Sequence, residues 1–414
     1  MTVLAHRDGE LCLESVPLAA IAARYGTPCF VYSRAALTAA YREFDGALAA
    51  LPHLTCYAMK ANSNLAVLDV FARLGSGFDV VSGGELARVI AAGGDPRRVV
   101  FSGVGKSDEE LHQALDLDIL SFNVESASEL EHLHRAARRA GKMAPVSIRV
   151  NPDVDARTHP YIATGLKESK FGIAFGEALP LYRRAAGLSG LALRGIAIHI
   201  GSQITTLEPY RQAAAKVLEL VDALGGEGIR LAHVDLGGGI GIRYRDETPL
   251  DLGEYAAMVA ALFRGRSETL IVEPGRRLTG NAGVLLTRVC YLKPGAARSF
   301  AVVDAAMNDL LRPALYDAWH EVRPVRPRDG PPRAWQIVGP VCESADFLAR
   351  DRELALAEGD LLAVLSAGAY AMAMSSNYNS RPRAAEVLVD GDAMHLVGRR
   401  ETVGELFARE SRLP

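Results

Sequence analysis

The sequence predicts an α/β protein in which a (β/α)8 barrel is combined with a mostly antiparallel β domain. Short apolar runs alternate with stretches of helical periodicity, which is typical of a parallel sheet covered by helices on both faces. This alternation stops near residue 284, where short strand-like runs separated by turn residues begin. We therefore expect two domains in this chain of 414 residues.

The first part of the chain contains eight apolar runs, most of them followed by a helical stretch. Eight such units favour a closed, TIM-like barrel over an open sheet. The runs are 54–59, 77–82, 99–103, 119–124, 146–150, 196–201, 233–238 and 269–274.

The second part contains shorter runs separated by turn dipeptides such as Pro294-Gly295 and Asp390-Gly391. This spacing indicates antiparallel strands. We expect residues 1–30, which hold a further strand, to join this domain, so that the barrel spans 31–283 and the β domain spans 1–30 and 284–414. The predicted strands are 284–293, 298–304, 334–338, 360–365, 384–389 and 393–397.

Composition excludes several classes of protein. The formal net charge is −3 and no block of like charge occurs, which argues against a nucleic-acid binder. The hydrophobic fraction of 49% argues against disorder, and no run reaches the ~20 apolar residues of a membrane helix. Five scattered cysteines without a C-x-x-C pair argue against a zinc knuckle and suit reduced thiols, so we expect no metal and a cytoplasmic location.

Polar residues follow or end most of the predicted barrel strands, where the active site of such a barrel lies. Taken singly, a solvated lysine, a packed histidine or a tight glycine turn would explain each of them. Their coincidence at strand ends favours a common site. The residues are Lys60, Asp79, Ser82, Arg149, Asn151, His199, Gly201, Ser202, Gly237–Gly239 and Glu273–Arg276.

Two other motifs do not fit their usual function. The segment Gly103–Ser107 ends like a phosphate-binding P-loop, but Val100 stands where the first glycine belongs. The glycine run after residue 236 resembles a dinucleotide loop, but Ile242 occupies its last glycine position. His132 and His134 lie in a helical stretch without a supporting cluster, so we interpret them as surface residues.

The residues at the strand ends fit pyridoxal phosphate as a cofactor. This cofactor needs a lysine amine, an anion cradle for its phosphate and a partner for its pyridine nitrogen. Lys60 could supply the amine, and the exposed backbone around Gly237–Gly239 and Gly275–Arg276 could bind the phosphate. A carboxylate at Glu273 would keep the ring nitrogen protonated and make the ring a strong electron sink, whereas an arginine there would weaken it.

Eleven motifs in a fixed order carry a family resemblance from about residue 25 to residue 408. They are YAMKANSN at 57–64, FDVVSGGE at 78–85, RVNP at 149–152, HPYI at 159–162 with GLKE at 165–168, HIGSQ at 199–203, DLGGG at 235–239, EPGR at 273–276, MND at 307–309, RPALY at 312–316, GPVCES at 339–344, and GAY at 368–370 with NYNSR at 377–381. On these motifs the chain resembles the diaminopimelate decarboxylase family, in the alanine-racemase-like barrel class of pyridoxal-phosphate enzymes.

The resemblance implies a role for each matching residue. Lys60 would carry the cofactor as a Schiff base, His199 would stack on its ring, Glu273 would pair with its pyridine nitrogen, and Cys342 would be the proton donor. Asp79 and Arg149 would support these groups. The phosphate would be held by Ser202, Gly239, Gly275, Arg276 and Tyr370, and the substrate by Arg276, Arg312, Tyr316, Glu343 and Tyr370.

The resemblance also implies the reaction and the assembly. Meso-2,6-diaminopimelate would lose CO2 to give L-lysine, the last step of lysine biosynthesis. The Cys342-Glu343 motif would reach the site from a second subunit, so the active unit would be a homodimer. Three alternatives stay open: a decarboxylase of another basic amino acid or carboxylated polyamine, a racemase, and a catalytically inactive homologue that acts as a binding or regulatory protein.

Overall fold

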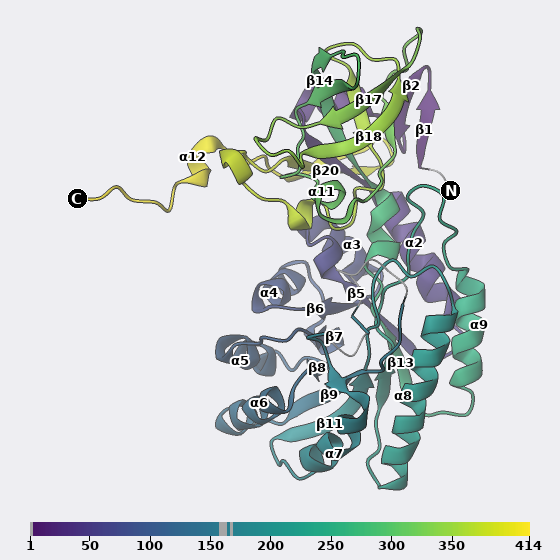
Figure 1. The fold of residues 1–414 in the computed structure, drawn as a ribbon. Helices are drawn as coiled ribbons and strands as arrows, with labels where there is room; N and C mark the ends of the chain where they lie inside the picture. The colour runs from purple at the N-terminus through teal and green to yellow at the C-terminus, as the bar shows by residue number, and fades with distance from the viewer. Residues whose placement is uncertain (1–2, 157–163, 166–168) are drawn as a thin grey trace. The chain divides into compact units, whose positions relative to one another are not determined.

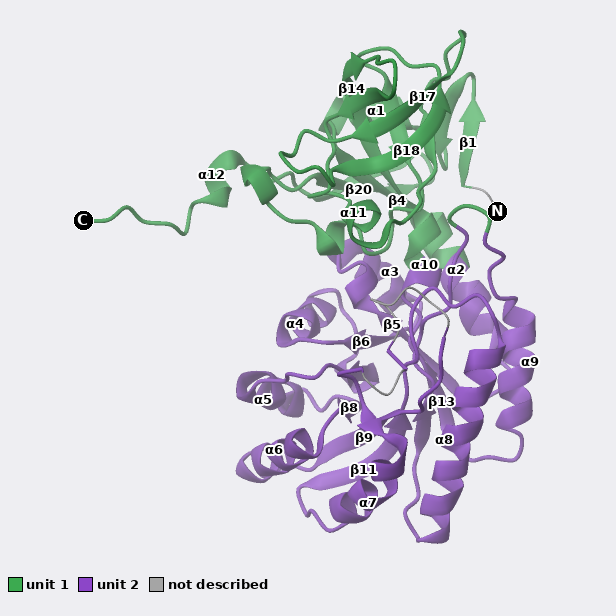
Figure 2. Ribbon diagram, viewed as in Figure 1, with its two compact units in different colours: residues 1–39, 244–246, 279–414 green, residues 40–243, 247–278 purple. Residues whose placement is uncertain are grey.

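The computed structural model describes residues 3–156, 164–165 and 169–414 (Figure 1). The motif at 159–162 and most of that at 165–168 lie outside the described residues. The chain divides into two compact units (Figure 2). Unit 1 holds residues 1–39, 244–246 and 279–414, and unit 2 holds residues 40–243 and 247–278. The domain boundaries predicted from the sequence lie at residues 31 and 284.

Unit 2 contains the predicted barrel of eight parallel strands. The ring is closed because β5 pairs with both β6 and β13, and β8 pairs with β9. The strands are β5 (His53–Ala58), β6 (Gly77–Val80), β7 (Val99–Phe101), β8 (Ser121–Val124), β9 (Ala144–Asn151), β11 (Leu191–Ala197), β12 (His233–Asp235) and β13 (Thr269–Val272), with the short β10 (Ile173–Ala174) beside β9.

Each predicted barrel run overlaps one of these strands. The largest difference is at β11, which was predicted at 196–201 but occupies Leu191–Ala197. Arg194 and Gly195 interrupt the apolar run there, and the pairing of β11 with β9 shifts register between Leu193 and Gly195. Because of this irregularity, the first half of the strand lacks the continuous apolar pattern on which the prediction relied.

Helices surround the barrel strands in Figure 1. Several start at a polar N-cap that follows a strand closely, as Ser82, Ser107 and Ser126 do before α4, α5 and α6. Each of these serines accepts a hydrogen bond from the backbone N–H three residues later, which satisfies a free donor of the first turn. The helices are α2 (Arg34–Ala47), α3 (Leu65–Arg73), α4 (Gly83–Ala91), α5 (Asp108–Asp116), α6 (Ala127–Arg139), α7 (Phe175–Ala186), α8 (Glu208–Gly226), α9 (Leu252–Leu262) and α10 (Arg276–Thr279).

The barrel interior contains a polar chain away from the strand ends predicted to carry the site. Ser121 Oγ lies 2.8 Å from Ser147 Oγ, which lies 2.8 Å from Nε2 of His233. All three residues are buried, and burial lowers the pKa of His233 to about 4. A Cβ on Gly195 would lie 2.2 Å from the His233 ring, so glycine is the residue that leaves room for it.

Unit 1 is a mixed, mostly antiparallel β domain, as the sequence predicted. In its main sheet β14 pairs antiparallel with β4, β15 and β19, while β15–β17 and β4–β20 are parallel. The strands are β1 (Leu4–Arg7), β2 (Glu10–Leu13), β3 (Val16–Pro17), β4 (Cys29–Ser33), β14 (Gly283–Lys293), β15 (Ser299–Val303), β16 (Val322–Pro324), β17 (Arg333–Val338), β18 (Phe347–Leu354), β19 (Leu361–Val364), β20 (Ala385–Asp390) and β21 (Ala393–Gly398), and the helices are α1 (Leu18–Tyr25), α11 (Arg312–Tyr316) and α12 (Val403–Leu406).

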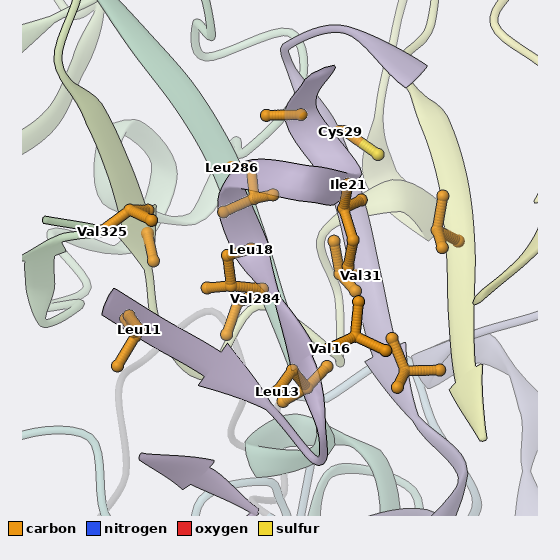
Figure 3. Close-up of a cluster of buried hydrophobic side chains, with 14 of the residues drawn as sticks. Leu11, Leu13, Val16, Leu18, Ile21, Cys29, Val31, Val284, Leu286 and Val325 are labelled. Atoms are coloured by element: carbon orange, nitrogen blue, oxygen red, sulfur yellow. The ribbon is translucent and has the colours of Figure 1, made fainter. Parts of the chain in front are cut away.

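The N-terminal segment packs into the core of unit 1 (Figure 3). Leu18 and Ile21 of α1 lie in one buried cluster with Val31 of β4 and with Val284 and Leu286 of β14. Burying side chains of this size contributes roughly 1.5–3 kcal/mol each. Residues far apart in the sequence therefore share one hydrophobic core.

Candidate active site

Lys60 follows the end of β5, in a short 3-10 helix of one turn, Met59–Ala61. Its Nζ donates to Oδ2 of Asp79 on β6 at 2.5 Å, and the Asp79 side chain is fully buried. The Tyr57 hydroxyl donates to the backbone carbonyl of Asn62 at 2.9 Å and fixes the path of this turn. The barrel thus presents an amine at a strand end and holds it against a buried carboxylate.

Glu273 and Asp235 form a second buried acidic group at the ends of β13 and β12. They are 6% and 1% exposed, and Oδ1 of Asp235 accepts the backbone N–H of Gly237 at 2.8 Å. Burial, together with the negative charges of Asp235 and Asp79, raises the pKa of Glu273 well above its usual value. Within the described residues, no group hydrogen bonds to Oε1 of Glu273.

His199 lies just beyond β11 and has a neutral ring. Its Nδ1 accepts the backbone N–H of Gly238 at 3.2 Å, which places the ring proton on Nε2. Burial and the positive charges of Arg149 and Lys60 lower the pKa of His199 well below its usual value. The side chain is half-buried and offers a flat, uncharged surface.

The glycine run after β12 is required by close backbone packing. A Cβ on Gly238 would lie 2.0 Å from the carbonyl oxygen of Glu273, and one on Gly239 would lie 2.2 Å from that of Gly201. Gly239 also has a φ of +99°, in the region that glycine adopts most readily. These glycines bring the loops of three strand ends together.

Ser202, Gly275 and Arg276 supply polar groups to the same end of the barrel. Nη2 of the buried Arg276 donates to Oγ of Ser202 at 2.9 Å. A Cβ on Gly275 would lie 3.0 Å from the carbonyl oxygen of Ala58, so this loop runs closely against the segment that carries Lys60. A hydroxyl, a guanidinium and backbone groups suit an anion.

A cavity of about 310 Å³ joins several of these residues, a volume typical of small-molecule sites. Lys60, Arg149, His199 and Glu273, all candidates from the sequence, line it. The remaining lining residues are Val81, Ser102, Gly103, Val104, Asn123, Thr164, Phe171, Ala197 and Ile198.

Glu125 supports this cavity and was missed by the sequence analysis. Its carboxylate accepts hydrogen bonds from Nη1 of Arg149 at 2.8 Å and from the backbone N–H groups of Gly103 and Gly172 at 3.0 Å each. The side chain is 2% exposed, so it holds a buried ion pair. The signal available in the sequence was an acidic residue directly after the apolar run 119–124.

Asp235 was also missed as a site residue, although it stands inside the quoted motif DLGGG. An acidic residue within a buried apolar run was the available signal. Its carboxylate also lies near Asn123, whose Nδ2 donates to Oδ2 at 3.4 Å and to Oγ of Ser102 at 3.1 Å. Asp235 therefore connects Asn123, which lines the cavity, to the glycine run.

Arg312 and Tyr316 belong to unit 1, where they begin and end α11. The buried Arg312 guanidinium stacks over the ring of Tyr244 at 4.4 Å, and its Nη1 donates to Nε2 of His320 at 3.1 Å. His320 in turn donates from Nδ1 to the backbone carbonyl of Leu365 at 2.8 Å. Tyr244 and His320, which the sequence analysis did not select, thus orient this arginine.

Cys342, Glu343 and Tyr370 also belong to unit 1. Cys342 and Glu343 are exposed neighbours in one turn, and Cys342 is the exposed member among the five free cysteines. Tyr370 has a φ of +55°, which is unusual for a bulky side chain and costs backbone strain. Strain of this kind is often retained at functional sites.

The P-loop-like lysine has a structural role. Lys106 is buried and donates to Oε1 of Glu129 at 2.6 Å and to the backbone carbonyls of Gly103 and Asn123. His132 lies 2.6 Å from an Asp108 carboxylate oxygen near the surface. In the described part of the chain, no cluster of three metal-ligating side chains occurs, and no helix combines the length and hydropathy needed to cross a membrane.

The residues present in unit 2 fit pyridoxal phosphate. Oε1 of Glu273, buried and not hydrogen bonded within the described residues, could accept a hydrogen bond from a protonated ring nitrogen. Lys60 provides an amine in the same cavity, and His199 provides a flat neutral face. Ser202, Gly239, Gly275 and Arg276 provide groups that suit a phosphate.

Comparisons with known proteins agree with this fit. Residues 34–280 match the family model described as pyridoxal-dependent decarboxylase, pyridoxal binding domain. A diaminopimelate decarboxylase of Pseudomonas aeruginosa is 61% identical over the full length of both chains.

Solved structures resemble this chain as well. A crystal structure of diaminopimelate decarboxylase from Helicobacter pylori complexed with L-lysine is 42% identical, with a TM-score of 0.92 over 95% of this chain and 99% of that one. The corresponding protein of M. jannaschii, in co-complex with L-lysine, is 34% identical, with a TM-score of 0.95 over 100% and 98% of the two chains.

Replacing Glu273 by glutamine should change how stability depends on pH in the cofactor-free protein. A carboxyl group with a raised folded pKa imposes no penalty below its ordinary value of 4.5, and a growing penalty as pH rises toward the folded pKa. Glutamine stays neutral, so E273Q should gain stability relative to the wild type between pH 5 and pH 8, by up to about 1.4 kcal/mol per pH unit.

Guanidinium unfolding midpoints at the two pH values measure this difference. E109Q, which neutralises an exposed carboxylate on α5, serves as the control. A stability difference between E273Q and the wild type that is the same at pH 5 and pH 8 would show that Glu273 is not a destabilised buried acid.

Proposed function

The chain belongs to the pyridoxal-dependent decarboxylase family and, within it, to the diaminopimelate decarboxylases, and we propose which of its residues perform each part of the decarboxylation. The enzyme depends on pyridoxal phosphate and converts meso-2,6-diaminopimelate to L-lysine and CO2 in lysine biosynthesis. One observation carries the assignment of residues: Lys60 and the buried acid Glu273 line the same cavity at the ends of barrel strands.

Unit 2 binds the cofactor in this proposal. When bound, pyridoxal phosphate supplies a carbonyl carbon that reacts with amines and a ring that accepts electrons from the substrate. Lys60 carries the cofactor through Nζ, and Asp79 holds that nitrogen in place, supported by their contact of 2.5 Å. Glu273 would pair with the ring nitrogen and keep it protonated, and His199 would pack against the ring.

The phosphate is held by Ser202, Gly239, Gly275 and Arg276, with Tyr370 of unit 1. The Arg276–Ser202 hydrogen bond supports this assignment because it places a cation and a hydroxyl side by side. Arg149, neutralised by Glu125, supports the cavity wall beside His199.

The substrate is recognised at both of its charged ends. A distal carboxylate requires a cation, and a distal ammonium group requires an anion. Arg276, Arg312, Tyr316 and Tyr370 serve the carboxylate and the polar groups of the substrate, and Glu343 serves the ammonium group. The stacking of Arg312 over Tyr244 and its hydrogen bond to His320 support this role, because they hold the guanidinium in one orientation.

Cys342 would donate the proton that replaces the lost carboxylate, and the Lys60 amine would displace L-lysine as the product leaves. We further propose that the active unit is a homodimer in the cytoplasm, in which the Cys342-Glu343 turn of one copy serves the cavity of the other. The exposed apolar residues Val403, Phe407 and Leu413 in the C-terminal segment, which extends away from the sheets of unit 1 in Figure 1, support a second copy. The five free cysteines support a reducing compartment.

The wild-type enzyme with added pyridoxal phosphate should release CO2 from meso-diaminopimelate far faster than from L-lysine, ornithine or arginine. Lys60→Ala should lower this rate by at least about a thousandfold and abolish the absorbance of the lysine-bound cofactor, because the carrier amine is gone. Measuring CO2 with each amino acid also tests the alternative substrates. A Lys60→Ala enzyme that decarboxylates at the wild-type rate would refute the role of Lys60.

Mixing two severely impaired variants should restore activity if the site is shared between copies. A hybrid dimer of K60A and C342A contains one cavity with both groups intact, so an equimolar random mixture should reach about a quarter of wild-type specific activity. Each variant purified separately provides the control. Activity that stays at the level of the separate variants, after subunit exchange has been verified by mass spectrometry, would contradict the shared site.

A further inference from the structure

Cys342 lies in a turn in which most of the backbone N–H groups are hydrogen bonded. In this Cys342 turn (residues 339–346), the N–H of Val341 donates to Oδ2 of Asp346 at 2.9 Å, and that of Glu343 donates to the Val341 carbonyl at 2.8 Å. The N–H of Cys342 itself donates to Oδ1 of Asn379 at 2.8 Å. The bond at Cys342 thus comes from a side chain 37 residues away in the sequence.

Asn379 holds an unusual backbone conformation within a second turn (residues 376–381, the Asn379 turn). Its φ is +55° and its ψ is 29°, in the left-handed region that most side chains avoid and asparagine tolerates. This conformation accompanies an Asn379 side chain that bonds to the backbone of Cys342 rather than to its own turn. The residue therefore combines backbone strain with a specific contact.

Both turns are anchored on the same segment after β15. Asp346 accepts the N–H of Met307 at 2.7 Å and so ties the Cys342 turn to this segment. Asn308 exchanges backbone and side-chain hydrogen bonds with Ser376, and its Oδ1 accepts from Nε of Arg381 at 3.2 Å. The hydrogen bond between Asn379 and Cys342 therefore directly links two turns that are both hydrogen bonded to the same segment.

We propose that Asn379 is a positioning residue for the Cys342 thiol, and that it acts by fixing the backbone nitrogen from which the direction of that side chain follows. The inference rests on the proposed proton-donor role of Cys342. Because this turn is exposed, it provides little packing around the thiol. The hydrogen bond to Asn379 therefore determines the direction of the Cys342 side chain. A proton donor displaced by about 1 Å can lose roughly a hundredfold in rate.

Three substitutions separate the contact from the strain. N379G keeps the left-handed backbone, which glycine adopts readily, and removes the acceptor oxygen. N379D keeps both the backbone tolerance and an acceptor at the same place. D8G replaces another left-handed residue, φ +50° at an exposed turn of unit 1, and controls for a change to glycine in this conformation.

The experiment is a double-mutant cycle on the holoenzyme. We expect N379G to lower kcat for CO2 release from meso-diaminopimelate by roughly 10- to 100-fold, with KM, bound-cofactor absorbance and Tm close to wild type. N379D should recover most of the lost kcat, and D8G should match the wild type. The double variant N379G/C342A should fall within about twofold of C342A alone, because the effect of Asn379 passes through the thiol.

Two results would overturn the inference while leaving Cys342 in its role. Either N379G turns over like the wild type although C342A is slow, or the losses of N379G and C342A multiply in the double variant. Multiplying losses would mean that Asn379 acts on the fold and not on the thiol. A C342A enzyme that runs at full rate is a different result, because it refutes the proton-donor role and removes the positioning role with it.

Discussion

The burial of acidic groups at the barrel rim is the constraint on which the rest of this structure depends. Asp79, Asp235 and Glu273 lie at or near the ends of β6, β12 and β13, each 6% exposed or less. Carboxylates removed from water are costly unless they are protonated, hydrogen bonded or paired with a cation. Lys60 pairs with Asp79, and the Gly237 N–H bonds to Asp235, whose pKa burial raises to about 6. The pKa of Glu273 is raised as well, and this residue keeps an oxygen that a cofactor could use. The site is thus built to accept positive charge.

The other features of unit 2 keep these groups in place. Glycines at 238, 239 and 275 let the strand-end loops approach within distances that a Cβ would block. Glu125 gathers Arg149 and two loop N–H groups on the opposite side of the cavity, with good hydrogen-bond geometry for a buried ion pair. Side chains also fix functional groups in unit 1, since Arg312 is oriented by Tyr244 and His320 and the Cys342 turn is bonded to the side chain of the distant Asn379.

Much of the fold was predictable because local patterns of apolar and polar residues indicate its strands and helices. The alternation of apolar and helical runs predicted the eight barrel strands, and the change near residue 284 predicted the β domain. The strand β18 (FLARDREL) was missed, because its charged residues interrupt the apolar pattern that was sought. Lys60 and Glu273 could be selected as candidates because a parallel barrel gathers its strand ends. Glu125 and Asn379 were not selected, because the partners that define their roles lie 22 to 47 residues away and are brought to them only by the folded chain.

The most direct test of this account is to find which amine carries the cofactor. Borohydride reduction of the holoenzyme fixes pyridoxal phosphate covalently to the nitrogen that holds it, and peptide mapping by mass spectrometry then identifies the residue. We expect the label on Lys60, the amine that the buried Asp79 holds in the cavity with Glu273. A label on another lysine, such as Lys106 or Lys216, would contradict it.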